Sequence, residues 1–376
     1  MTNLLLIFGG CSPEYEVSLQ SASAVIAHLE SERFRERFRT VCLGITRDGQ
    51  WYRYYGGTER IADGSWCAGV SDPPSESDGL CRPAWISQNR GEGLVEMTEA
   101  GPAVTRIDLA FPVLHGKNGE DGTVQGLLEL AGIPVVGCGT LASALCMDKD
   151  RAHKLAKLAG VDVPRSVTLR RAEFEEDRQY CAEGGGDCAE TLPHMTGIPG
   201  ALRFPVFVKP LRAGSSFGIS RVCEAGALVA ALEKAFEYDD TAVVEEAVSG
   251  FEVGCAVMGT DPEALLCGRV DEIELADGFF DFREKYTLET SKIHCPARID
   301  RQTEQRVQQC AKVIYRALGC SGLARVDLFL TPAGRIVFNE VNTIPGFTAH
   351  SRYPNMMKAA GMPFPDMLDR LLTMYL

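Results

Sequence analysis

Strand-like and helix-like segments alternate through the first 140 residues, and this pattern constrains the fold more than any other feature of the chain. Residues 4–8, 40–45 and 107–111 are short apolar runs bounded by turn residues, as buried strands are. Residues 16–29 and 124–130 have the pattern of helices. The alternation predicts an α/β fold with a doubly wound parallel sheet, whose ligands bind beyond the C-terminal ends of the strands.

The rest of the chain has room for more than one core. At 376 residues, two or three domains are expected. We interpret residues 56–92 as a surface loop, residues 170–202 as a polar helix followed by an exposed loop, and residues 276–295 as a functional lid. The other strands expected are 50–55, 133–136, 205–209, 218–222, 242–247, 251–258, 265–273, 324–330 and 335–339, and the other helices are 141–158, 228–236 and 302–318.

Charge and cysteine usage exclude several classes of function. The net charge is −13, so nucleic acid and membranes are poor partners. No apolar run approaches the roughly 18–20 residues that span a bilayer, and residues 4–8 lack the length and preceding positive charge of a signal peptide. The 14 cysteines are scattered without a Cys-x-x-Cys pair, which is typical of buried thiols in a reducing cytosol. We therefore expect a cytoplasmic protein whose converging basic groups bind a small anion.

Two predicted strands near the C-terminus carry the strongest chemical signal. Alternation along a strand puts Arg325 and Asp327 on one face, and the same period puts Glu340 and Asn342 together. These oxygens suit Mg²⁺ held between the protein and phosphate oxygens, and Arg325 would neutralise a phosphoryl group in transit. A salt bridge between the strands is the alternative explanation.

Two loops offer further anion-binding groups. Residues 211–217 form a Gly/Ser loop after Lys209, and its backbone N–H groups can wrap phosphate oxygens. The loop is not a Walker P-loop, because no helix opens with Gly-Lys-Ser/Thr, and an ordinary hairpin is the alternative. Gly346, in the rigid loop 342–348, either lets a backbone N–H approach a substrate oxygen or only makes a turn.

Two N-terminal residues are ambiguous on their own. Glu14 precedes a predicted helix and is either a ligand-binding carboxylate or an acid that interacts with the helix dipole. His115 lies in a Gly-rich loop at the C-terminal edge of a strand, where α/β sheets bind ligands. A lone loop histidine is more often structural or simply exposed.

Taken in order, these segments resemble the D-alanine–D-alanine ligase family of the ATP-grasp superfamily over nearly the whole chain. The motifs are GGCSPEYEVS at 9–18, HGKNGEDG at 115–122, MDK at 147–149, KPLRAGSSFG at 209–218, EVNTIPG at 340–346 and HSRYP at 350–354. FDFREKYTL at 280–288 and SRYP at 351–354 most resemble the VanG-type vancomycin-resistance ligases, which join D-alanine to D-serine.

The resemblance implies an ATP-grasp fold with domains at residues 1–140, 141–224 and 225–376, and a homodimer. ATP would lie between the last two domains with two Mg²⁺ ions, for which Mn²⁺ is an alternative. Nucleotide-binding roles fall to Lys149, Lys209, Ser216, Glu245, Glu246, Ala247, Val248, Glu252, Phe279, Asn339 and Glu340. Metal-binding roles fall to Asp327, Glu340 and Asn342.

The same resemblance implies the chemistry. ATP would convert the carboxylate of D-alanine to an acyl phosphate, which the amine of a second amino acid attacks. Glu14 would hold the first ammonium group, in a hydrogen-bonded chain with Ser215 and Tyr286 that closes the lid. Catalytic roles thus fall to Glu14, Ser215, Tyr286, Arg325 and Gly346, and substrate-binding roles to His115, Lys285, Ser351 and Arg352.

The resemblance also bears on the second substrate. Relatives that use D-lactate have a histidine where Lys285 and Tyr286 stand here, so an amine nucleophile is expected. Arg352 stands where ordinary cell-wall ligases usually have an apolar residue, which favours D-serine and a role in vancomycin resistance through peptidoglycan precursors. The alternatives are a D-alanine–D-alanine ligase of ordinary cell-wall synthesis, another ATP-grasp carboxylate–amine ligase, and a non-catalytic ATP-binding protein.

Overall fold

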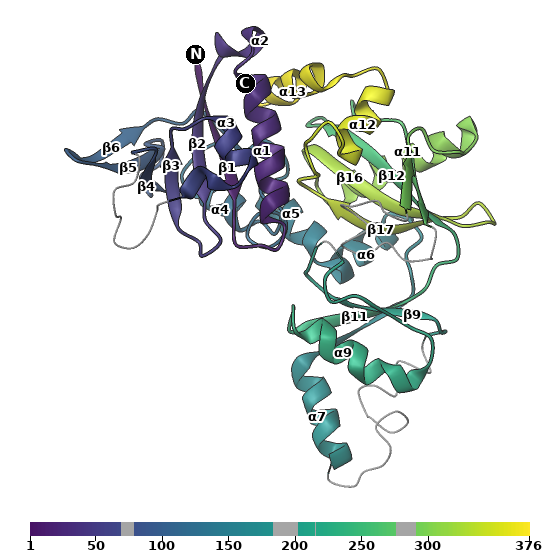
Figure 1. Cartoon of the computed structure of the whole chain (residues 1–376). Helices are drawn as coiled ribbons and strands as arrows, with labels where there is room; N and C mark the ends of the chain where they lie inside the picture. Colours follow the sequence, from purple (N-terminus) through teal and green to yellow (C-terminus); the bar gives the residue numbers. More distant parts are fainter. Residues whose placement is uncertain (69–78, 183–201, 215, 276–290) are drawn as a thin grey trace.

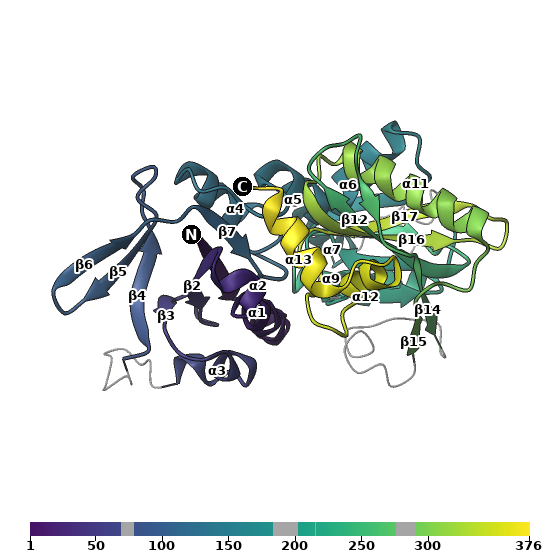
Figure 2. The ribbon, with the colours of Figure 1, turned by 90° about the horizontal axis from the view of Figure 1, so that it is seen from above.

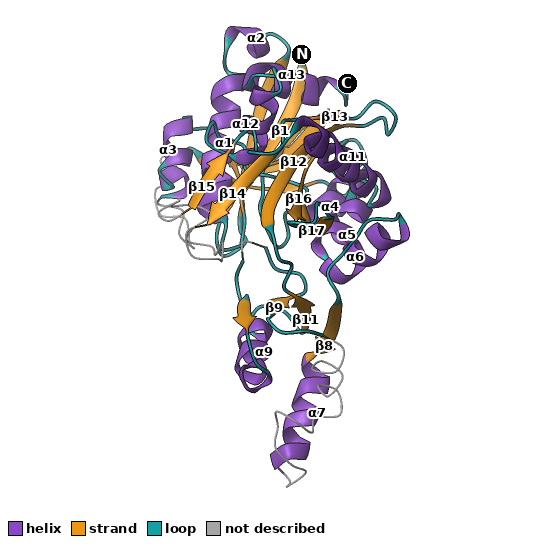
Figure 3. Ribbon diagram, turned by 90° about the vertical axis from the view of Figure 1, so that its right-hand side faces the viewer, coloured by secondary structure: helices purple, strands orange, loops and turns teal. Residues whose placement is uncertain are grey.

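The computed structural model describes residues 1–68, 79–182, 202–214, 216–275 and 291–376. Within these residues the strands form three sheets, which we call the first, central and third sheets in chain order (Figure 1). The central sheet and its helices project away from the other two sheets (Figure 3). The protein is therefore a mixed α/β structure.

The first sheet has a parallel core, as the alternation of elements predicts. Its strands in spatial order are β6 (Gly101–Thr105), β5 (Leu94–Thr98), β4 (Cys81–Ile86), β3 (Trp51–Tyr54), β2 (Phe38–Ile45), β1 (Thr2–Gly9) and β7 (Leu109–Pro112). β1 pairs in parallel with both of its neighbours. The strands from β3 to β6 add an antiparallel extension, which was not predicted.

The apolar run of β1 serves two helical layers at once. Leu6 and Phe8 share a core with α1 (Tyr15–Leu29), whereas Ile7 shares a core with α4 (Thr123–Leu130) on the other face. Successive side chains of a strand point to opposite faces of a sheet, so a continuous apolar run is what a strand covered on both sides requires.

The prediction of a surface loop at residues 56–92 is wrong for the part that the structure describes. This part contains α3 (Thr58–Ala62), the 3-10 helix η1 (Ser65–Cys67) and β4. The β4 pattern is hard to recognise, because Arg82 and Pro83 are exposed in succession and break the alternation of buried and exposed residues.

Two further expectations need correction. Residues 133–136 make a single parallel bridge to β7 rather than a strand. The predicted helix 141–158 is two helices, α5 (Thr140–Met147) and α6 (Lys149–Leu158). They are separated because Asp148 leaves the helical conformation, with φ −86° and ψ 100°, and its side chain caps α6.

The central sheet is antiparallel throughout and has its own core. Its strands in spatial order are β10 (Ser220–Val222), β9 (Val206–Pro210), β11 (Thr241–Glu246) and β8 (Ser166–Arg170), with α7 (Arg171–Ala182), η2 (Ala225–Ala227) and α9 (Leu228–Phe236). α7 confirms the polar helix expected at the start of residues 170–202, and residues 183–201 lie outside the described part.

The third sheet carries the C-terminal half of the candidate site. Its strands in spatial order are β15 (Ser291–His294), β14 (Asp271–Leu275), β12 (Phe251–Gly259), β16 (Gly322–Leu330) and β17 (Ile336–Asn342), with β13 (Leu266–Cys267) paired to β12. The predicted strand 265–273 is therefore two strands. α11 (Arg301–Ala317) shares a core with β12 and β16.

The last helix returns to the first sheet. α12 (Arg352–Ala359) is followed by α13 (Phe364–Thr373), which lies beside α1 and α2 (Glu32–Arg35) (Figure 2). The buried side chains of α13 join the same core as α1, namely Met367, Leu368, Leu371 and Leu372. None of the described helices is long and apolar enough to cross a membrane.

Candidate active site

β16 and β17 bring four predicted residues together. In the register of this pair, Asp327 stands opposite Glu340, and Arg325 stands opposite Asn342. Arg325 donates to both oxygens of Asp327, from Nε to Oδ1 at 2.8 Å and from Nη2 to Oδ2 at 2.7 Å. Asn342 Nδ2 donates to Asp327 Oδ2 at 2.9 Å. Because Asp327 is only 1% exposed, these neighbours balance its charge in place of water.

The donor chemistry of this cluster fits a hard divalent cation. Asp327 and Glu340 supply carboxylates, and Asn342 turns its amide nitrogen to Asp327, which leaves its amide oxygen as a ligand. In the described part of the chain, no group of three or more His, Cys, Asp or Glu side chains is arranged to hold a metal. An ion here would therefore take its other ligands from phosphate and water, as Mg²⁺ does.

Lys209, at the end of β9, reaches this cluster from the central sheet. Its Nζ lies 2.6 Å from Glu245 Oε2 on β11. Burial would lower the pKa of Lys209, but attraction by Glu245, and then by Glu340 and Glu252, outweighs burial and raises the pKa. Lys209 therefore lies within electrostatic range of a predicted metal ligand on the third sheet, and its ammonium group stays charged for a phosphate.

A second lysine lies beside the Gly/Ser loop. Lys149 begins α6 directly after the break at Asp148, and its Nζ donates to the Ala213 carbonyl oxygen at 2.8 Å. Ser216, in the same loop, has a left-handed φ of 60°. The loop and two buried lysines together form a cationic wall that fits phosphate oxygens.

The two carboxylate oxygens of Glu245 differ, because only Oε2 has a hydrogen-bond partner in the described part of the chain. Its Oε1 is buried and has no hydrogen-bond partner among the described residues. Because a buried acceptor without a donor is costly, a ligand N–H group is expected there, and the amino group of adenine is such a donor. Glu246 forms an ion pair at the rim, and Ala247 and Val248 continue from the strand, half-buried.

Glu14 lies against two glycines from distant parts of the chain. A Cβ atom at Gly116 would stand 2.8 Å from Glu14 Oε2, and one at Gly214 would stand 3.1 Å from the same oxygen. Only glycine allows both approaches without a shift. Gly214 belongs to the Gly/Ser loop, so this N-terminal carboxylate meets the predicted phosphate loop next to Ser215.

His115 is buried between the N-terminal loops and the loop after β17. Its Nδ1 lies 2.8 Å from the Ile344 carbonyl oxygen. Burial lowers the pKa of His115, the Glu14 charge opposes this effect, and Arg325 adds to it. Glu14 and Arg325 therefore both lie within electrostatic range of His115, as the predicted substrate site requires.

The loop after β17 brings Gly346 and Ser351 together. A Cβ atom at Gly346 would stand 2.9 Å from Ser351 Oγ, and that oxygen accepts the Thr348 N–H at 3.0 Å. Phe347 N donates to Ser21 Oγ of α1 at 3.1 Å. The loop is thereby fixed to the first sheet's helix.

Arg352 begins α12 inside a cage of carboxylates. Its Nε and Nη2 each donate to Asp271 at 2.8 Å. Its Nη1 lies 3.2 Å from Glu252 and 3.4 Å from Asp327. The guanidinium is 10% exposed, so Arg352 connects the predicted second-substrate side of the site with the predicted ribose and metal side.

Sequence reasoning missed Glu120, although it lies in the HGKNGEDG motif. Its Oε1 accepts the Ile344 N–H at 2.9 Å, and its Oε2 accepts the Gly116 N–H at 3.0 Å. Burial, followed by the Glu14 charge, raises the pKa of Glu120 to about 8. The sequence feature that could have identified Glu120 as a candidate is its position as a carboxylate in a Gly-rich loop.

Two other buried residues were also missed. Asp271 is fully buried under Arg352, and nothing in its sequence context marks it. His153 Nε2 lies 2.7 Å from the Asn339 carbonyl oxygen, so Asn339 takes part in the site through its backbone. The spacing of His153 from Lys149 was a usable signal, because residues four apart share a helix face.

Four predicted residues lie outside the described part of the chain: Ser215, Phe279, Lys285 and Tyr286. The hydrogen-bonded chain to Glu14 and the lid at residues 276–290 therefore stay predictions. The predicted lid of 276–295 is wrong at its C-terminal end, because residues 291–294 form β15, which pairs with β14. The other predicted site residues all belong to the described part, and several of them interact with one another between the sheets.

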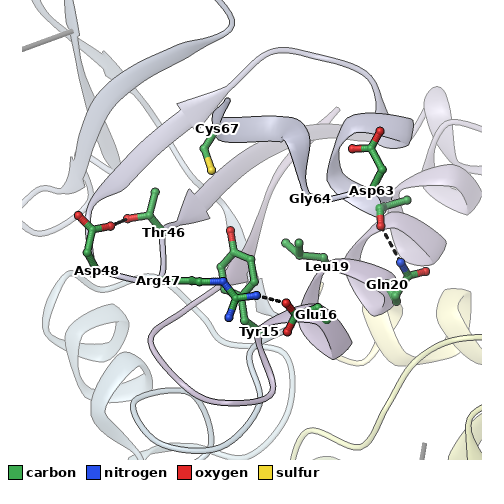
Figure 4. A pocket seen from close by; sticks show the side chains of 11 residues that line it. Tyr15, Glu16, Leu19, Gln20, Thr46, Arg47, Asp48, Asp63, Gly64 and Cys67 are labelled. Atoms are coloured by element: carbon green, nitrogen blue, oxygen red, sulfur yellow. Dashed lines mark hydrogen bonds and ion pairs between the residues drawn. The ribbon is translucent and has the colours of Figure 1, made fainter. Parts of the chain in front are cut away.

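A cavity of about 500 Å³ lies apart from this cluster, against the first sheet (Figure 4). It is lined by Tyr15, Glu16, Leu19, Gln20, Thr46, Arg47, Asp48, Ala62, Asp63, Gly64 and Cys67. Arg47 pairs with Glu16 and lies over the Tyr15 ring at 4.2 Å. None of the predicted site residues lines this cavity, and its one cationic side chain is already paired.

Comparison with known proteins gives concordant matches over nearly the whole chain. Two family models match, “D-ala D-ala ligase N-terminus” over residues 3–138 and “D-ala D-ala ligase C-terminus” over residues 155–373. A putative D-alanine–D-lactate ligase of Streptomyces coelicolor is 43% identical over 99% of this chain and 96% of its own. The vancomycin B-type resistance protein VanB of Enterococcus faecalis is 43% identical over 98% of this chain and 97% of its own. The crystal structure of VanG D-Ala:D-Ser ligase from Enterococcus faecalis has a TM-score of 0.86 at 54% identity, covering 100% of this chain and 99% of that chain.

Proposed function

Since this chain belongs to the D-alanine–D-alanine ligase family, whose members are ATP-dependent ligases, we propose that it joins D-alanine to D-serine through an acyl phosphate. The observation that carries the proposal is that Lys209 of the central sheet lies within electrostatic range of Glu340 of the third sheet, which stands opposite Asp327. A terminal phosphate held between the two sheets would need a cationic group on one side and metal-binding carboxylates on the other.

The first step activates D-alanine. Glu14 holds its ammonium group while a carboxylate oxygen attacks the γ-phosphorus of ATP. The bond from that phosphorus to the oxygen of ADP breaks, and the acyl phosphate forms. Lys149 and Lys209 bind phosphate oxygens, and Arg325 balances the charge of the phosphoryl group in transit.

The divalent cation that the family uses fits the cluster at the end of β16 and β17. Asp327, Glu340 and Asn342 would hold it, and when bound it neutralises phosphate charge. We propose two Mg²⁺ ions, with Mn²⁺ as an alternative. Arg325 counters the charge of Asp327 directly.

The second step forms the peptide bond. The amine of the second amino acid attacks the acyl carbon, the bond to phosphate breaks, and the amine loses a proton as inorganic phosphate leaves. The oxyanion of the tetrahedral intermediate would face Arg325 and the Gly346 N–H. Water would hydrolyse the acyl phosphate, so the lid at residues 276–290, with Lys285 and Tyr286, would exclude it.

Arg352 supports D-serine as the second substrate. A serine hydroxyl needs a polar partner inside a closed site, and the buried pair of Arg352 and Asp271 supplies donors and acceptors near Ser351. The VanG D-Ala:D-Ser ligase, at 54% identity, is consistent with this choice. D-Alanine is the alternative, and it requires no such pair.

The reaction is tested with ATP, Mg²⁺ and D-alanine, with D-serine, D-alanine or D-lactate as the second substrate. Phosphate release and product masses are recorded together. We expect the D-alanine–D-serine product to dominate. Dominance of the D-alanine dipeptide would overturn the choice of D-serine, and ATP turnover without any dipeptide or ester would overturn the ligase assignment.

Arg352→Leu sharpens this test. We expect kcat/KM for D-serine to fall relative to D-alanine by about 10-fold or more, because one polar contact to substrate is lost. Arg316→Leu is the matched control, since Arg316 ends α11 at the surface and bonds only a backbone oxygen at 2.7 Å there among the described residues. If the ratio of kcat/KM for D-serine to kcat/KM for D-alanine is the same in both variants, Arg352 does not select the second substrate.

The remaining elements of the proposal follow from the family. We propose a cytoplasmic homodimer that makes peptidoglycan precursors and confers vancomycin resistance. We also propose domains at residues 1–140, 141–224 and 225–376. Because β11 pairs with β8 and β9, the strand at 241–246 associates with the central sheet although it follows residue 224.

A further inference from the structure

The buried face of α6 carries a histidine that the proposed mechanism does not use. Lys149 and His153 are one helical turn apart, so they point to the same side of the helix. His153 is 3% exposed, and the neighbours on this face are alanines, Ala152 and Ala156. A polar ring has therefore been buried where an apolar side chain would fill the space equally well.

Two contacts with β17 fix the orientation of this ring. Nε2 lies 2.7 Å from the Asn339 carbonyl oxygen, and because a carbonyl only accepts, Nε2 carries a hydrogen. The ring also packs edge-on against Phe338, with centroids 5.3 Å apart. Asn339 directly precedes Glu340, so His153 holds the strand at the point where its metal-binding carboxylate begins.

The other ring nitrogen faces the central sheet. His153 Nδ1 and Glu245 Oε1 are 3.6 Å apart, and neither atom has a hydrogen-bond partner in the described part of the chain. This distance is within the range of an ion pair but slightly longer than a hydrogen bond. Burial would raise the pKa of Glu245, but Lys209, and next His153, lower it, so both neighbours favour the ionised carboxylate.

Glu245 also contacts Lys209. Its second oxygen, Oε2, lies 2.6 Å from Lys209 Nζ. A row of polar groups thus runs from the backbone beside Glu340, through His153 and Glu245, to Lys209, the residue that would bind a phosphate oxygen. The path crosses from the third sheet to the central sheet by way of α6.

We propose that His153 is a positioning residue of the nucleotide site, which holds Glu245 and through it Lys209 in register with β17. The inference rests on the proposed function, because that function gives Glu245 and Lys209 their nucleotide. It assigns His153 no contact with the reacting atoms. A residue that only filled space would need neither of its two polar contacts.

The test compares three histidine variants. His153→Phe keeps the ring contact with Phe338 but removes both nitrogens, and His153→Gln restores a donor for the Asn339 carbonyl. His28→Phe is the matched control, because the His28 ring packs on Phe364 at 4.4 Å between centroids, far from the site. Binding of ADP with Mg²⁺, without amino acids, is measured by calorimetry beside the KM values for ATP and D-alanine.

We expect His153→Phe to weaken ADP binding and to raise the KM for ATP, each by about 10-fold, as the loss of one hydrogen bond would. The KM for D-alanine should change by less than about 2-fold, and His153→Gln should recover part of the loss. His28→Phe should change none of these values. Unchanged ADP binding in His153→Phe, or in His153→Gln if the first variant does not fold, would overturn the proposal.

A double-mutant cycle separates a path through Glu245 from a general effect on packing. In a Glu245→Gln background, His153→Phe should weaken ADP binding by less than about 2-fold. The same 10-fold loss in both backgrounds would show that His153 does not act through Glu245, and the proposal would fail. If the cycle behaves as expected while the wild-type enzyme makes no D-alanyl product, only the proposed function is refuted.

Discussion

Helix α13, at the C-terminal end of the chain, and helix α9, in its middle, bury their apolar faces in different ways. Leu371 of α13 lies in a core that also contains Leu29 of α1 and Met258 of β12, so elements of the first and third sheets pack together. Leu232 of α9 lies in a core formed by the central sheet and its own helices. Apolar burial therefore joins the two ends of the chain and leaves the central sheet separate.

The central sheet meets the other two through polar groups of the candidate site. Lys209 lies within electrostatic range of Glu340, His153 lies between Glu245 and β17, and Gly214 lies against Glu14. Charges and loops that bind substrates make a weaker joint than a shared core does. We therefore expect bound nucleotide to strengthen this junction and to matter less for the contact between the first and third sheets, which share an apolar core.

The largest effect is expected at the junction itself. Glu340→Ala removes a proposed metal ligand from the third sheet, so phosphate release should fall by about 1,000-fold or more. Because Glu340 is half-buried at the site, the fold should persist, which circular dichroism checks. Near-normal turnover in a folded variant would show that the third sheet does not supply the metal ligand.

A pair of core substitutions tests the separation of the two cores. Leu371→Ala should destabilise the first and third sheets together by about 2–5 kcal/mol, and Leu232→Ala should destabilise the central sheet by a similar amount. Hydrogen exchange followed by mass spectrometry reports each sheet separately. If either substitution loosens all three sheets equally, the cores are not independent.

The fold was predictable where a local pattern determines the partner. The apolar run of β1 and the periodicity of α9 were sufficient, and the predicted helix 228–236 coincides with α9. The docking of α13 on the first sheet was not predictable, because an amphipathic helix shows which face is buried but not what covers it. The antiparallel extension from β3 to β6 was not predicted, because the pattern of buried and exposed residues in β4 is irregular.

The site shows the same division. The spacing of Arg325 and Asp327 on one strand predicted their shared face, and the structure brings Asn342 to them as expected. Asp271 and His153 become candidates for a functional role only because of their partners, which are far away in the chain. Asp271 bonds Arg352, and His153 bonds the Asn339 carbonyl oxygen. Which buried polar groups meet is decided by tertiary packing, and no local pattern contains that information.

An intermediate effect is expected from Glu120, which joins the first and third sheets by polar contacts. Its pKa is raised to about 8, so the folded chain keeps a proton that the unfolded chain releases near its ordinary value of 4.5. Stability from this group is therefore complete below pH 4.5 and is lost as pH rises toward 8. Glu120→Gln does not titrate, so its free energy of unfolding should rise relative to that of the wild type over this range, by up to several kcal/mol at about 1.4 kcal/mol for each pKa unit.

Urea denaturation at several pH values measures that difference. A gap between the two proteins that stays constant from pH 5 to pH 9 (roughly the range spanned by the two pKa values) would show that Glu120 keeps the same charge in both states. The first and third sheets share an apolar core, which by itself does not titrate. If Glu120 titrates as expected, the contact between these two sheets also depends on pH.

The smallest effect is expected at the surface joint between α2 and α13. Asp369 lies 2.8 Å from Arg33 and 2.5 Å from Arg37. Burial would raise the pKa of Asp369, but these arginines lower it, so its contribution is present above the ordinary carboxyl range and is lost on acidification. Both arginines are 42% exposed, so water and salt screen the pairs.

Asp369→Asn should therefore cost less than about 1 kcal/mol in urea denaturation, and the cost should vanish near 1 M NaCl. A larger, salt-independent loss would mean that charge, rather than the apolar face of α13, holds the first and third sheets together.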